Sequence, residues 1–131
     1  MKMLITMCLL FIAVIQANAQ KALPANLKDT MTVVGNDLKR MTAQAKDANM
    51  NVDSTAAANE IAQFLQHAKN FTPDAIKNEA QKSQYLQALD QSAQIAQQLA
   101  QAFQTNDNAK AIELIKSIGQ VRRESHSNFK D

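Results

Sequence analysis

The chain of 131 residues contains one cysteine, two prolines, two glycines and no tryptophan. The cysteine, Cys8, lies in an apolar N-terminal run that we expect to be removed, and the rest of the chain has none. The absence of thiols excludes disulfides, iron–sulfur clusters, thiolate zinc sites and the C-x-x-C-H attachment of a c-type haem. The mature protein must therefore be held together by its own core, by a non-covalently bound cofactor, or by both.

The mature chain also lacks an excess of charge of either sign. Once the first 19 residues are removed, Lys2 is lost from the 14 basic residues, which leaves 13 against 12 acidic ones. The chain has no block of basic residues and only 5% aromatic residues. Nucleic-acid binding is therefore disfavoured, because it needs a positive patch or stacking rings.

Catalytic signatures are missing as well. Gly35 and Gly119 stand apart, so there is no glycine-rich phosphate loop, and no pairing of a nucleophile with a base is evident. We therefore do not expect an enzyme.

The N-terminus is typical of an export signal. Met1-Lys2 is a short basic start, residues 3–15 are almost wholly apolar, and Ala17-Asn18-Ala19 has the small-x-small pattern of a signal peptidase site. Residues 1–19 are therefore expected to be a cleaved signal peptide, and residues 20–131 one domain. The apolar run is shorter than the roughly 20 residues of a membrane-spanning helix, so we expect a soluble periplasmic protein and no membrane span after cleavage.

The remaining sequence predicts helices only, since β-branched residues are sparse and no stretch alternates with period two. The first helix is expected over about residues 25–46, where apolar residues follow steps of three and four. A second is expected from Asp53 or Ser54 to Phe71. A third is expected from an N-cap at Thr72 to Phe103, with a break or bend near residues 81–83, and a fourth from residues 105–108 to the chain end.

Four apolar stripes and three short polar connections predict an all-α fold, an antiparallel up-down-up-down four-helix bundle. In this topology the first helix lies beside the fourth. Met31 lies near the start of the first helix and His126 near the end of the fourth, which places both at one end of the bundle at similar depth.

A thioether and an imidazole that face each other can serve as the two axial ligands of haem iron. Arg122 and Lys130 lie one turn before and after His126, where they can pair with haem propionates. Val34, Leu38, Tyr85 and Leu89, with Leu86, are candidates for the apolar walls. Each residue also has an ordinary interpretation: Met31 as core filler, His126 as a cation near a helix C-terminus, and the two basic residues as a solvated face.

The second histidine, His67, has no carboxylate or histidine beside it at metal-ligand spacing. We interpret it as a surface residue without a metal role.

Two segments resemble the soluble cytochrome b562 family of the bacterial periplasm: ANLKDTM at residues 25–31 with NDLK at 36–39, and RRESHSNFK at 122–130. The similarity spans nearly the whole mature chain, and the family's methionine and histidine ligands fall on Met31 and His126. The resemblance implies a four-helix bundle with one non-covalent, six-coordinate haem b (iron protoporphyrin IX) per chain. It further implies a small electron carrier with an unidentified periplasmic redox partner.

Two positions depart from the family pattern. Lys130 stands where the family has arginine, which keeps the charge but loses the bidentate fork, and Leu89 stands at a usually aromatic position.

The resulting expectation is a monomeric periplasmic electron carrier. Two alternatives remain open at this point: a haem buffer or carrier that does not shuttle electrons, and a haem-free helical adaptor.

Overall fold

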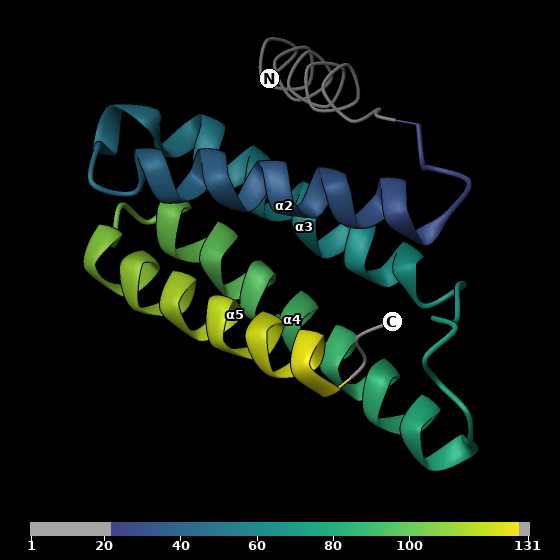
Figure 1. Cartoon of the computed structure of the whole chain (residues 1–131). Coiled ribbons are helices and arrows are strands. Elements are labelled where there is room, and N and C mark those ends of the chain that lie inside the picture. The colour runs from purple at the N-terminus through teal and green to yellow at the C-terminus, as the bar shows by residue number, and fades with distance from the viewer. Residues whose placement is uncertain (1–21, 129–131) are drawn as a thin grey trace, which may run out of the picture.

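The computed structural model describes residues 22–128, and it is helical throughout apart from short connections (Figure 1). The elements are α2 (Leu27–Gln44), the short 3-10 helix η1 (Ala48–Met50), α3 (Asn51–Ala68), α4 (Glu79–Gln104) and α5 (Asn108–Asn128). The expected all-α four-helix bundle is confirmed. The expected signal peptide at residues 1–19 and the candidate Lys130 lie outside the described residues.

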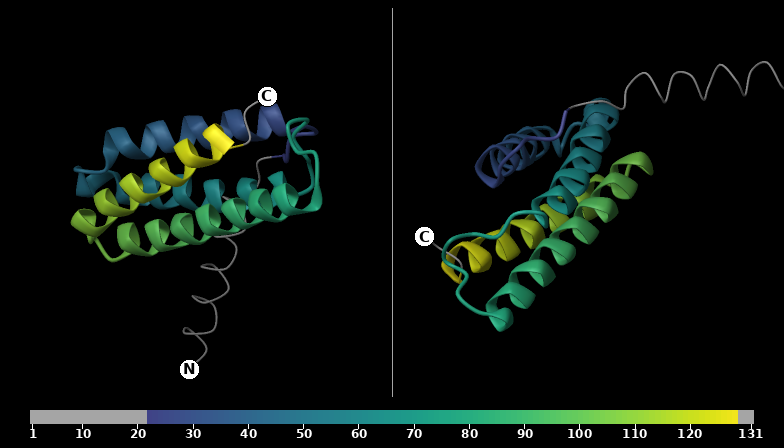
Figure 2. Two further views of the ribbon diagram at one scale, coloured as in Figure 1. Left: turned by 60° about the horizontal axis from the view of Figure 1, so that its bottom comes forward. Right: turned by 90° about the vertical axis from the view of Figure 1, so that its right-hand side faces the viewer.

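The four helices run alternately up and down, but their contacts are unequal. α3 packs extensively on α2 and on α4, and α5 packs on α4, whereas α2 and α5 touch at few points. Figure 2 shows α2 and α5 on the same side of the α3 and α4 pair. The start of α2 and the end of α5 lie at the same end of the bundle.

The core is built from a few large side chains set among alanines. Phe64, Phe103, Met41, Ile61 and Leu99 are fully buried. Alanines on α3 and α4 fill the space between them: Ala57, Ala58, Ala62, Ala68, Ala93, Ala96, Ala100 and Ala102. Such small side chains let the two helix backbones approach closely, and this explains why the α3 and α4 pair is the most tightly packed part of the bundle.

The expected start of the third helix is wrong. Residues 71–78 are not helical, and α4 begins after Asn78, whose side chain accepts a hydrogen bond from the backbone N–H of Gln81 at 2.9 Å. The Gln81 side chain in turn accepts from the backbone N–H of Lys77 at 2.7 Å. This pair of caps starts the helix, while Pro73 accepts from the N–H of Ile76 in a turn. α4 then continues without interruption to Gln104, so no break occurs near residues 81–83.

The second helix begins earlier than expected. η1 leads directly into α3 at Asn51, two residues before Asp53, and no side chain caps this start. The Asn51 amide instead donates to the side-chain oxygens of Asn106 at 2.8 Å and Asn108 at 2.9 Å. The Asn108 amide donates back to Asn51 at 2.9 Å and to the carbonyl oxygen of Ala45 at 2.7 Å. These three asparagines, the asparagine clasp, join the two turns at the bundle end far from Met31 and His126.

The sequence suggested that His67 is a surface residue, but the structure shows it in contact with other parts of the chain. It is half-buried near the end of α3, and its Nε2 donates to the carbonyl oxygen of Pro24 at 2.6 Å. Its ring also meets the ring of Phe71 edge-on, with centroids 5.2 Å apart. His67 therefore holds the segment that precedes α2 against the end of α3.

Across residues 22–128, no helix has both the length and the apolar character that crossing a bilayer requires.

Candidate functional site

The sparse contact between α2 and α5 leaves a cavity of about 200 Å³ that all four helices line. Its walls are mostly apolar and are formed by Leu27, Met31, Val34, Leu38, Ile61, Leu65, Pro73, Tyr85, Ala88, Leu89, Ser92, Ile118, Arg122, Ser125 and His126. A cavity enclosed by apolar side chains with a few polar groups at one side is the usual form of a cofactor site.

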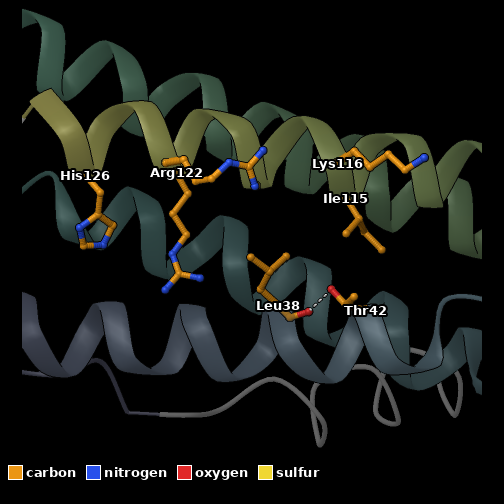
Figure 3. Close-up of a pocket in the computed structure, with 8 residues that line it drawn as sticks. Leu38, Thr42, Ile115, Lys116, Arg122 and His126 are labelled. Carbon is orange, nitrogen blue, oxygen red and sulfur yellow. Dashed lines mark hydrogen bonds between the residues drawn. The ribbon is translucent and has the colours of Figure 1, made fainter.

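Met31 and His126 enter this cavity from opposite helices. Met31 lies in the second turn of α2 and is half-buried, whereas His126 lies in the last turn of α5 and is exposed. Figure 3 shows the His126 imidazole directed from α5 toward α2. The structure therefore brings the two predicted ligand residues to one cavity, at the bundle end where α2 starts and α5 finishes.

Arg122 lies one turn before His126 and reaches across the gap toward α2 (Figure 3). A Cβ atom at Gly35 would lie 3.6 Å from Arg122 Nη2, so the guanidinium rests close to the α2 backbone. Arg122 borders the cavity and two wider hollows of about 620 and 870 Å³ that open onto solvent beside it. Its charge is thus available at the mouth of the site.

Val34, Leu38, Tyr85 and Leu89 all line the cavity. Val34 and Leu38 come from α2, on the same face as Met31, and Tyr85 and Leu89 come from successive turns of α4. Leu86 packs against the core but does not line the cavity. These side chains can exclude water from a flat apolar ligand.

Tyr85 supplies a polar group to the apolar wall. Its hydroxyl donates to the carbonyl oxygen of Ala68 at 3.4 Å, and burial raises the pKa of Tyr85 to about 12. The side chain is therefore neutral at physiological pH and contributes its ring to the wall.

Sequence reasoning missed the contribution of α3 and of the inner face of α5. Ile61 and Leu65 of α3, together with Ile118 of α5, close the cavity from the core side. Their helical spacing marked them as buried residues. Only the observed packing shows that they face this cavity.

The two potential metal ligands at the cavity, Met31 and His126, suit one class of cofactor. Among residues 22–128 no group of three or more His, Cys, Asp or Glu side chains could hold a metal ion. One thioether and one imidazole are too few ligands for a free metal ion, but Met31 and His126 would be enough to hold the iron of a haem, whose macrocycle supplies the remaining ligands. The open seam between α2 and α5, with a cation at its mouth, also suits a flat ligand with acidic edges.

The comparisons with known proteins agree with this fit. No curated protein and no solved structure matches the chain. The model of one protein family, described as cytochrome b562, matches residues 26–130, which include all four helices, both predicted ligand residues and Lys130. On this match over most of its length, the chain belongs to the cytochrome b562 family.

Proposed function

We propose that the protein is a periplasmic electron carrier that binds one b-type haem non-covalently between α2 and α5. The observation that carries this proposal is the placement of Met31 and His126 in one apolar cavity between two helices that otherwise barely touch. Family membership supports the same cofactor and the same role.

In this proposal His126 and Met31 would hold the haem iron. A neutral imidazole is a strong iron ligand, and a thioether favours the reduced state, so the pair would suit electron transfer at a raised potential. Haem supplies the one-electron redox centre when it is bound, and the protein supplies ligands, orientation and shielding.

The apolar walls and the cation at the mouth orient the ligand. Val34, Leu38, Tyr85 and Leu89 favour the macrocycle over water on their faces of the cavity. Arg122 offers a fork of donors to a propionate, and Lys130 adds a second charge near the chain end. Both residues would hold the acidic groups of the haem.

The N-terminal sequence supports an exported location. Residues 1–19 have the three parts of an export signal, with a candidate cleavage site after Ala19. We propose that the mature chain, residues 20–131, works in the periplasm as a monomer.

Optical titration of the purified mature protein with haemin tests the proposal. We expect saturation at one haem per chain and sharp low-spin bands after reduction. Facile transfer of haem to an acceptor without fast, reversible reduction would indicate a haem buffer instead. Absence of saturable binding would indicate a haem-free adaptor.

Two substitutions test the ligands. Met31→Ala should leave a five-coordinate or weakly bound haem, and His126→Ala should weaken binding further because imidazole is the stronger ligand. Met50→Ala, at a partly exposed methionine in η1, and His67→Gln are the matched controls and should keep the wild-type spectrum. An unchanged spectrum in Met31→Ala would remove Met31 from the ligand set.

A further inference from the structure

Basic side chains gather around the mouth of the α2 and α5 seam. The two open hollows beside the cavity are bordered by Lys28 and Lys39 of α2 and by Lys116, Arg122 and Arg123 of α5. We call these five residues the cationic rim. All five are exposed, and no carboxylate borders either hollow.

The cluster of basic residues in the cationic rim does not result from an overall excess of basic residues. Lys2, Lys21, Lys130 and Asp131 lie outside residues 22–128, and the described part of the chain then carries equal numbers of basic and acidic residues. Five of its 11 basic residues nevertheless border these two hollows, whose linings contain no carboxylate.

No ion pair joins the rim to a carboxylate in the described part of the chain. Within residues 22–128, the ion pairs join Arg40 to Asp37 and Asp53, and Lys69 to Asp90, so none involves a rim residue. Asp29, next to Lys28 in sequence, accepts a hydrogen bond from the side-chain amide of Asn26, and its backbone N–H donates to the Asn26 side-chain oxygen at the start of α2. Glu124, next to Arg123, accepts from Gln120.

Unpaired like charges on one face repel one another and therefore do not stabilise the folded protein. They do create a positive potential over that face. Its range is about 10 Å at 0.1 M ionic strength, enough to steer an approaching anionic surface. Complementary charge raises association rates and sets the orientation of a partner more than it raises affinity. Such properties suit a brief electron-transfer encounter over the edge of a buried redox centre.

We propose that the cationic rim docks an acidic protein surface, that of the electron-transfer partner, over the seam between α2 and α5. This inference rests on the proposed function, because the seam is where electrons would leave a haem bound to Met31 and His126. An anionic membrane is the less suitable occupant. The large apolar side chains that are well exposed, Leu23, Met50 and Val52, do not border the two hollows, so the rim lacks apolar anchors for lipid.

The test uses the haem-loaded mature protein and a bacterial flavodoxin, a strongly acidic redox protein, as the probe. The rate of haem reduction by reduced flavodoxin is measured at low and high ionic strength. We expect a fast rate at low ionic strength that falls as salt is added. Two charge-reversal variants, Lys28→Glu with Lys39→Glu and Lys116→Glu with Arg123→Glu, should each lower the low-salt rate by about tenfold.

The control carries the same change in net charge at the opposite end of the bundle, where Lys46 and Lys110 are exposed. Lys46→Glu with Lys110→Glu should keep the rate within about twofold of wild type. All variants should bind haem with the wild-type reduced spectrum, because Arg122, Met31 and His126 are unchanged. Equal rates in the rim and control variants would overturn the proposal.

Two further measurements separate other outcomes. Cosedimentation with phosphatidylglycerol vesicles that is lost only in the rim variants, alongside unaltered flavodoxin kinetics, would identify a membrane as the occupant and overturn the proposal. Failure of the wild type to bind haem would defeat the proposed function. In that case, calorimetric titration of the haem-free protein with flavodoxin would test the docking proposal by itself. Binding that is lost in the rim variants would support docking at the cationic rim, and absence of binding to the wild type would overturn it.

Discussion

Tyr85 is the only tyrosine of a chain without tryptophan, so its ionisation can be followed without interference from other residues. The side chain is 8% exposed in the wall between α3 and α4, and desolvation there disfavours the phenolate. The pKa of Tyr85 therefore reports how far water is excluded from this wall of the cavity.

For the haem-free protein we expect the phenolate absorbance to appear with a midpoint near pH 12, against about 10 in the unfolded chain. Because the unfolded state loses its proton first, rising pH favours unfolding. The stability that depends on neutral Tyr85 is intact below pH 10 and is lost as pH rises toward 12, by roughly 2–3 kcal/mol in total.

The measurement compares urea unfolding of wild type and Tyr85→Phe across this range. Phenylalanine cannot ionise, so the variant should lack this part of the decline. A phenolate midpoint near 10 in the folded protein would contradict the buried placement.

The asparagine clasp gives a second prediction for a single side chain. Asn51 is 5% exposed, and Asn51→Ala leaves the amides of Asn106 and Asn108 short of a partner, which should lower the free energy of unfolding by about 1–3 kcal/mol. Asn59→Ala, the same change at an exposed position of α3, should cost less than about 0.5 kcal/mol. Denaturant unfolding followed by circular dichroism distinguishes the two. Haem saturation should be unaffected, since the clasp lies at the other end of the bundle.

At the scale of elements, the helices were predictable where apolar spacing is strong and less so at their starts. α2 and α5 fall within the expected ranges because their stripes are regular over five turns. The start of α4 was misjudged because Thr72-Pro73-Asp74 has the same local signature as a helix start. The start at Asn78 depends on two hydrogen bonds, from the Gln81 N–H to the Asn78 side chain and from the Lys77 N–H to the Gln81 side chain. The sequence alone did not favour this cap over the one at Thr72.

This difference is testable. Asn78→Ala removes the cap of α4 and should cost about 1 kcal/mol of unfolding free energy. Thr72→Ala changes an exposed residue in the preceding connection and should cost less than about 0.5 kcal/mol. A larger loss in Thr72→Ala than in Asn78→Ala, measured by thermal unfolding, would instead favour a helix that starts at residue 73.

The candidate site was predictable in part for the same reason. Helical spacing and the antiparallel topology place Met31 and His126 at one end, and both do line one cavity. The part of the wall formed by Ile61 and Leu65 was not predictable, because spacing shows that a residue is buried and does not show which neighbour it faces. The openness of the seam likewise depends on how α5 settles on α4, which no local pattern encodes.

For the whole molecule, a ligand that binds only the folded bundle must stabilise it. Free haem at a hundredfold excess over its Kd adds about 2.7 kcal/mol, which for a domain of this size raises Tm by about 10 °C or more. Thermal scans with and without haemin measure the shift. His126→Ala should show a much smaller shift, and an equal shift in that variant would point to binding outside the seam.

The unequal packing of the bundle has a consequence for how the protein can change over time. The close contacts are concentrated in α3 and α4, while the cavity lies where α2 and α5 scarcely meet. Exposed residues along the seam, such as Lys39 and Lys116, can therefore be exchanged with little loss of folding energy, whereas the alanines between α3 and α4 cannot be enlarged without clashes. Substitutions on the α2 and α5 half can therefore change which ligand and which partner the protein binds, while the α3 and α4 half remains an unchanged scaffold.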